Sequence, residues 1–176
     1  MSKKRILCIM GKSGTGKSTL INEICKDDTY HYVKSKTTRK VRVNDPNDIN
    51  THIFSTPDEF NKDLINGNIL ATYVSPNHYI NWTSEDLILE DKINVYAIDP
   101  IAFNELCDLC KDDYDIFGVY IDIPEEIRKD RIEKRGDVYV KEPHLRVGLL
   151  ENKQYYKVLD GTGTIKEVYN RFKKGI

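Results

Sequence analysis

Long apolar runs are missing from this chain. Behind a basic N-terminus only Ile6–Met10 is continuously apolar, and Gly11 and Lys12 end that run. A bilayer-spanning helix needs about 20 apolar residues, and the core of a secretory signal needs about 7–15. We therefore expect no membrane segment, no secretory signal and a cytoplasmic location.

An excess of charge of one sign is also missing. The 176 residues include 27 Lys and Arg against 28 Asp and Glu, a formal net charge of −1. Such a balance creates no overall attraction to nucleic acid or to an anionic membrane. We expect neither as a partner, so any site for a polyanion must be local. A hydrophobic content of 39% suits one globular domain with a real core.

Cysteine is too scarce for a disulfide framework or a zinc site. Of the four cysteines, Cys107 and Cys110 form a single C-x-x-C without a second Cys or His pair nearby. A structural zinc site needs four ligands. Because the pair falls inside an expected helix, we interpret both as structural thiols.

Apolar runs that predict strands alternate along the chain with segments of helical periodicity. Lys4–Met10 predicts a strand buried on both faces, followed by a glycine loop and a helix over 17–26. Further strands are expected at 30–33, 69–74, 78–82, 93–98, 117–123 and 156–159, and helices at 56–65, from 83, 100–110, 125–135, 144–155 and 164–173. Residues 43–50 read as an exposed loop and 136–143 as a mobile one. This alternation predicts an α/β fold, a parallel central sheet between two layers of helices.

A phosphate-binding loop follows the first strand. Residues 11–18, G-K-S-G-T-G-K-S, match the pattern G-x-x-x-x-G-K-[ST] in full. Glycines let backbone N–H groups converge on phosphate oxygens, and the next helix presents its positive dipole end. Lys17 is expected to reach the β- and γ-phosphates of ATP, and the Ser18 hydroxyl to bind Mg²⁺. The expected ATP-binding set is Gly11, Ser13, Gly14, Thr15, Gly16, Lys17, Ser18 and Thr19.

The known signatures of GTPases are poorly matched. A D-x-x-G pattern occurs at 115–118 and again at 160–163, but a pattern this short is common by chance. The base-reading N-K-x-D fails at residues 61–64, where Leu64 stands in place of the Asp. The sequence therefore disfavours a GTPase.

A second cationic cluster, S-K-T-T-R-K-V-R, occupies residues 35–42. Its arginines, Arg39 and Arg42, have the forked geometry that binds phosphate oxygens in pairs. Taken alone, such a stretch is most often the solvated end of a basic strand. Next to a phosphate-binding loop, it is a candidate for holding a second phosphate.

The combination resembles the guanylate kinase family. Members of that family have the motif S-x-T-T-R-x-P-R soon after the phosphate loop. They also have a later motif, R-x-x-x-R-G, which this chain matches at residues 131–136. The resemblance extends over essentially the whole chain. It implies a P-loop NTPase fold with a core at about 1–34, 91–128 and 154–176, an inserted segment for the nucleoside monophosphate at 35–90, and a helical lid at 129–153.

The resemblance also implies an activity, the ATP- and Mg²⁺-dependent phosphorylation of GMP or dGMP, as in purine nucleotide metabolism. Lys17 and the lid residues Arg131, Arg135 and Arg146 would act on the transferred phosphoryl group. The expected acceptor-binding residues are Ser35, Arg39, Arg42, His52, Tyr79 and Asp99. The partner is a small nucleotide, and the protein a monomer or small homo-oligomer.

Four departures concern the acceptor site. Ala71 stands where the family has a glutamate that reads guanine, and Ala97 replaces an acidic residue. His52 replaces a phosphate-binding tyrosine and Val41 a proline. Losing a charge-assisted hydrogen bond costs roughly 1.5–3 kcal/mol, or about ten- to a hundredfold in discrimination. Two alternatives therefore stay open, a P-loop kinase for another base or a phosphosugar, and a non-catalytic guanylate kinase-like module that binds proteins.

Overall fold

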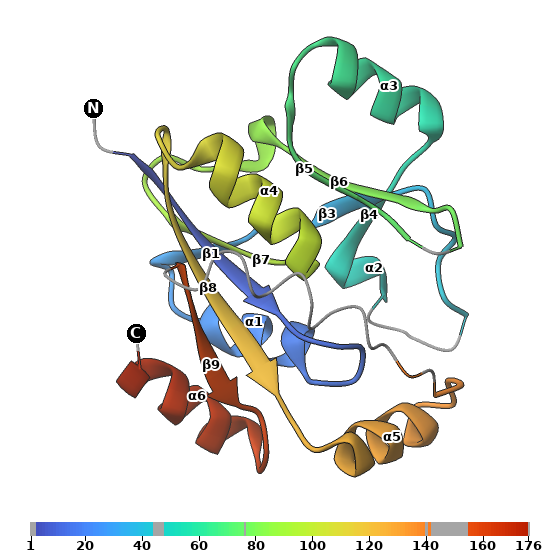
Figure 1. The fold of residues 1–176 in the computed structure, drawn as a ribbon, viewed down its shortest axis with the longest axis vertical. Coiled ribbons are helices and arrows are strands. Elements are labelled where there is room, and N and C mark those ends of the chain that lie inside the picture. The colour runs from blue at the N-terminus through green and yellow to red at the C-terminus, as the bar shows by residue number, and fades with distance from the viewer. Residues whose placement is uncertain (1–2, 44–47, 76, 140, 142–154, 176) are drawn as a thin grey trace.

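The fold is built on a five-stranded parallel sheet (Figure 1). The computed structural model describes residues 3–43, 48–75, 77–139, 141 and 155–175. The strand order is β2-β7-β1-β8-β9. Their bounds are Tyr30–Tyr32 (β2), Ile93–Ala97 (β7), Lys4–Met10 (β1), Tyr114–Asp122 (β8) and Tyr156–Asp160 (β9). All four pairings are parallel, so the carboxyl ends of the strands share one edge.

Two hydrophobic cores lie on opposite faces of this sheet. Alternate residues of β1 point to opposite sides, so that Ile6 and Cys8 join one core and Leu7 and Ile9 the other. Helix α4 (Pro100–Cys110) covers the first face, and α1 (Lys17–Ile24) and α6 (Ile165–Gly175) cover the second (Figure 1). The expected three-layer α/β/α architecture is confirmed.

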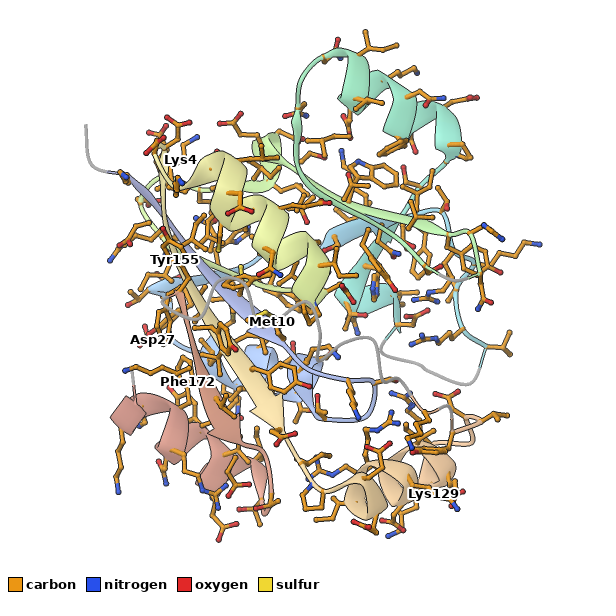
Figure 2. All side chains as sticks on the ribbon, in the orientation of Figure 1. Lys4, Met10, Asp27, Lys129, Tyr155 and Phe172 are labelled. Atoms are coloured by element: carbon orange, nitrogen blue, oxygen red, sulfur yellow. The ribbon has the colours of Figure 1, made fainter. Side chains whose placement is uncertain are left out.

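Helix α5 (Glu125–Lys134) follows β8 and lies beyond the carboxyl edge of the sheet (Figure 1). Figure 2 labels both ends of β1: Lys4 begins the strand, and Met10 leads into the glycine loop. The side chain of Lys129 marks α5 in the same view. Among the described residues, no helix is long and apolar enough to cross a bilayer.

A second, mixed sheet lies beside the first. Its order is β4-β3-β6-β5, with bounds His52–Phe54, Ser35–Thr37, Ile80–Ser84 and Ile69–Val74 respectively. β3 pairs in parallel with β4 and antiparallel with β6. Helices α2 (Asp48–Thr51) and α3 (Pro57–Ile65) belong to the same segment. A capping box between Thr56 and Glu59 begins α3. The Asp63 carboxylate then fixes α3 to the second sheet, because it accepts hydrogen bonds from Lys36, Trp82 and Ser84.

Three element predictions needed correction. Residues 43–50 are not simply an exposed loop, because Asp48 begins α2 and is only 1% exposed. The strand expected from His78 starts at Ile80, because His78 lies in a turn with a φ of 62° and donates its backbone N–H to the Ser75 carbonyl. That strand continues through Ser84, and only a short 3-10 helix, η1 (Glu85–Leu87), follows it.

Other predictions hold within a few residues. β8 begins at Tyr114, three residues before the expected start. Cys107 and Cys110 lie inside α4 as expected, and burial raises the pKa of the Cys107 thiol to about 12. The expected helix over 144–155 lies outside the described residues, apart from its last residue.

Candidate active site

The glycine loop at residues 11–16 connects the carboxyl end of β1 to the first turn of α1. Gly11 and Gly14 have φ angles of 147° and 83°, in the region that favours glycine. A Cβ on Gly11 would lie 2.7 Å from Thr15 Oγ1, and one on Gly14 would lie 2.8 Å from Ile132. The loop thus needs glycine both for its backbone conformation and for its close contact with α5.

Lys17 and Ser18 occupy the first turn of α1. The Lys17 ammonium donates to the carbonyls of Gly11 at 2.8 Å and Lys12 at 3.0 Å, so it spans the loop. Ser18 lines the adjoining cavity and lies near the Tyr32 side chain. Burial raises the pKa of Tyr32 to about 12, so this phenol is neutral at physiological pH. The Ser18 hydroxyl is the kind of oxygen ligand that Mg²⁺ accepts in proteins.

A large cavity of about 1170 Å³ runs from this loop to the second sheet. At one end it is bounded by the glycine loop, Lys17 and Ser18, and at the other by β3, β5 and β6. All eight expected ATP-binding residues line this cavity. The predicted phosphate loop and the predicted acceptor segment therefore face one continuous space.

Two arginines of the α5 region line the loop end of the cavity. Arg131 donates from Nη1 to the Thr15 carbonyl and from Nη2 to the Gly161 carbonyl, both at 3.3 Å. Arg135 lies 2.5 Å from a carboxylate oxygen of Asp137, which lines the cavity as well. Lys141, a cation that the sequence analysis did not single out, also lines the cavity. The third expected lid residue, Arg146, lies outside the described residues.

The two arginines of the second cationic cluster have different surroundings. Arg42 lines the cavity, whereas Arg39 is not among the lining residues. Arg39 instead forms a forked ion pair with Asp48, with both nitrogen–oxygen distances at 2.7 Å, and its guanidinium lies 5.5 Å from the centre of the Phe54 ring. Asp48 also accepts the backbone N–H of Arg42 at 2.8 Å. One buried carboxylate thus organises the loop that carries both arginines.

The surroundings of Asp48 and His52 keep the first side chain ionised and the second neutral at pH 7. Burial alone would raise the pKa of Asp48, but the hydrogen bonds from Arg39 and from the Arg42 amide outweigh it and lower that pKa to about 2. Burial, together with the nearby charge of Arg39, lowers the pKa of His52 to about 4. His52, which lines the cavity and hydrogen-bonds Thr51, is therefore neutral at pH 7.

The remaining expected acceptor residues are distributed around the far end. Ser35 lines the cavity and lies 3.3 Å from the Thr83 hydroxyl, and Asp99 lines it at the start of α4, where its carboxylate caps Ile101. Tyr79 is 39% exposed and is not a lining residue, whereas Tyr73 is. The methyl group of Ala71 forms part of the same wall.

The structure separates the two D-x-x-G patterns. Asp115 lies at the start of β8, paired with Arg5 at the edge opposite the glycine loop, too far along the sheet to meet a phosphate there. Asp160 ends β9 at the loop edge, and Gly161 and Gly163 line the cavity.

Comparisons with known proteins agree with this architecture. The sequence model of a family described as 50S ribosome-binding GTPase matches residues 6–89, slightly less than half of the chain, including the glycine loop. No curated protein matches the sequence.

Solved structures also match this chain, and two of them cover nearly all of it. A guanylate kinase from Anaplasma phagocytophilum superposes with a TM-score of 0.67 at 18% identity, covering 98% of this chain and 84% of that one. A gluconokinase from Sinorhizobium meliloti 1021 gives a TM-score of 0.54 at 12% identity, with coverages of 99% and 93%. At these identities the likeness concerns the fold. The protein shares the P-loop NTPase fold of these two structures.

Proposed function

We propose that this protein is an ATP-dependent phosphotransferase acting on a nucleoside monophosphate, with GMP and dGMP as the first acceptors to test. The observation that carries the proposal is one continuous cavity with cations at both ends. Lys17 and Arg131 lie at the glycine-loop end and Arg42 lies toward the second sheet. Donor and acceptor are both polyanions, so one space with two cationic ends suits the transfer of a phosphoryl group between them.

At the donor end, the backbone N–H groups of the glycine loop and the Lys17 ammonium would hold the phosphates of ATP. Ser18 would hold Mg²⁺, which when bound neutralises phosphate charge. Arg131, which donates to the Thr15 carbonyl, and Arg135, which lines the same cavity, would stabilise the charge that develops on the transferred group.

At the acceptor end, Arg42 would contact the acceptor phosphate. Arg39 would act with it by fixing the loop through Asp48. Ser35, Thr83 and Asp99 offer hydroxyl and carboxylate groups to the base, and neutral His52 offers a ring nitrogen. The acceptor's own phosphate oxygen is ionised at neutral pH, so no strong general base is required, and catalysis rests on alignment and electrostatics.

The second candidate is a P-loop kinase for another acceptor, either a different base or a phosphosugar. Ala71 favours it, because a methyl group accepts no hydrogen bond from a purine edge. The match to a GTPase model concerns the half of the chain that carries the glycine loop, so hydrolysis of GTP without an acceptor is included as a separate arm of the test.

The test follows ADP or GDP formation with Mg²⁺ and ATP or GTP. The acceptors are GMP, dGMP, AMP, CMP, UMP, dTMP, a phosphosugar and none. Lys17→Ala and Arg42→Ala are the controls. Turnover with GMP or dGMP that is lost in both variants supports the proposal in full, whereas turnover with another nucleoside monophosphate keeps the reaction class and favours the second candidate for the base. Turnover with the phosphosugar alone, GTP hydrolysis that no acceptor stimulates, or ATP binding without turnover on any acceptor overturns it; the last result favours a binding module.

A further inference from the structure

Helix α5 contains an arginine that the reaction proposed above does not use. Arg128 is 0% exposed, although Lys129 and Asp130 beside it are exposed. It precedes Ile132 by four residues, so both occupy the same buried face of the helix. Burying a guanidinium costs several kcal/mol unless its donors are paired. A buried arginine at this position must therefore be stabilised by hydrogen bonds or by opposite charge.

Within the part of the chain that the structure describes, Arg128 contacts three segments. Glu125 accepts from Nε at 3.2 Å and from Nη2 at 2.7 Å. Nη1 donates to the Ser13 carbonyl, within the glycine loop, at 3.2 Å. The ring of Tyr139 lies over the guanidinium, 4.7 Å from its centre, in cation–π geometry.

Glu125 contacts the same three segments. Its carboxylate accepts hydrogen bonds from Arg128, from the Tyr139 hydroxyl and from the Lys12 ammonium, the last at 3.2 Å. The hydrogen bonds from Arg128 and Tyr139, followed by that from Lys12, lower the pKa of Glu125 to about 2. The carboxylate therefore stays ionised throughout the neutral range, and the network keeps its charges.

The network sets where α5 lies on the glycine loop. Arg128 and Arg131 are three residues apart and donate to the carbonyls of Ser13 and Thr15, two residues apart. Between these two contacts, Ile132 packs on Gly14 so closely that a Cβ there would lie 2.8 Å away. Arg131, which faces the cavity, thus shares one helix turn with an arginine fixed to the loop.

From this geometry we infer that Arg128, together with Glu125, is a positioning residue for phosphoryl transfer. It fixes α5 to the glycine loop and so holds Arg131 beside the reacting phosphate, without contacting substrate itself. The inference rests on the proposed function for its effect on turnover, but not for the docking of the helix. An error of about 1 Å in placing a catalytic group can cost about a hundredfold in rate.

The primary test is Arg128→Lys, which keeps the charge and loses the fork. Glu125→Gln and Tyr139→Phe weaken single links of the same network. Lys129→Gln is the matched control, because Lys129 is exposed on the same helix and pairs only weakly with Glu133 at 3.7 Å. Each variant is measured for kcat, acceptor KM, affinity for a fluorescent ATP analogue and thermal unfolding.

We expect Arg128→Lys to lower kcat by about ten- to a hundredfold with KM changed by less than about threefold. Smaller losses are expected in the two single-link variants and none in Lys129→Gln. Unchanged kcat per folded molecule in the three network variants overturns the inference and leaves a buried ion pair that serves only stability. If Arg128→Lys does not fold, Glu125→Gln and Tyr139→Phe decide by the same criterion.

Amide hydrogen exchange of the free protein separates this inference from the proposed function. Docking by Arg128 predicts faster exchange in both residues 12–17 and residues 128–135 of Arg128→Lys than in Lys129→Gln. A wild type without transferase activity but with this exchange pattern refutes the proposed function and retains the docking role. Equal exchange in the two variants refutes the docking itself, whatever the activity.

Discussion

Replacing Asp48 with Asn tests whether one buried carboxylate organises the acceptor loop. Its side chain is 1% exposed and accepts two hydrogen bonds from Arg39 and one from the Arg42 amide. Asn keeps the shape but turns an NH₂ group toward a guanidinium that is itself only 16% exposed. Breaking a buried ion pair in this way costs about 3–5 kcal/mol.

The lowered pKa of Asp48 makes part of this energy depend on pH. The pKa of Asp48 falls from 3.8 to about 2 on folding, which corresponds to roughly 2 kcal/mol at neutral pH. Because the folded pKa is the lower one, this stabilisation is complete above the unfolded value and is lost as pH falls from about 4 to 2. The difference between wild type and Asp48→Asn should therefore shrink over that window.

The assay is urea unfolding of both proteins from pH 7 to pH 2.5, with acceptor KM measured at pH 7. We expect a loss of about 3 kcal/mol at pH 7, a melting temperature lower by roughly 6–12 °C, and a KM raised by about tenfold or more. Asp130→Asn is the control, because it breaks an exposed pair with Lys134 that contributes at most about 1 kcal/mol. A stability loss in Asp48→Asn no larger than that of the control would refute the reasoning.

Three further substitutions give direct tests. Lys17→Ala should lower transfer by about a thousandfold or more, because it removes the ammonium expected to contact the phosphates of ATP. The unfolding temperature should stay within a few degrees, because this ammonium lies on the glycine loop, where it donates to the carbonyls of Gly11 and Lys12, and not in either hydrophobic core. Ala71→Glu should raise the preference for GMP over AMP by about ten- to a hundredfold in kcat/KM, because a carboxylate there can accept from the guanine edge. His52→Gln should remove part of the stability loss of the wild type between pH 6.5 and 4 in unfolding experiments, because a folded pKa of about 4 means that the unfolded state binds the extra proton.

Local signals were sufficient for part of the fold. The glycine pattern at 11–18 is typical of a loop that joins a strand to a helix, because the loop's backbone requires glycine at fixed positions. β1 ends and α1 begins where this pattern predicts. The capping box at Thr56 and Glu59 likewise forms within four residues and sets the start of α3. In both cases the determining contacts lie within one short segment.

Contacts between distant segments could not be predicted in this way. The Arg39 side chain reaches a carboxylate nine residues further on, across a stretch without periodicity, so sequence reasoning treated its loop as exposed. Arg128 meets Ser13 across a separation of 115 residues. The one available signal was the i, i+4 relation of Arg128 to Ile132, which places an arginine on the buried face of α5.

The arginines of this chain therefore differ by what faces them rather than by the motif that contains them. Arg39 and Arg42 are three residues apart in one cationic cluster, yet a buried carboxylate engages the first guanidinium while the second lines the cavity. Arg128 and Arg131 repeat that division on α5, with Glu125 engaging the first of them. In each pair, the carboxylate-bound arginine fixes the backbone that carries its neighbour. The motif matches assign Arg39, Arg42 and Arg131 to phosphate and leave out Arg128, whereas the burial of Asp48 and Arg128 separates positioning groups from groups that can reach a substrate.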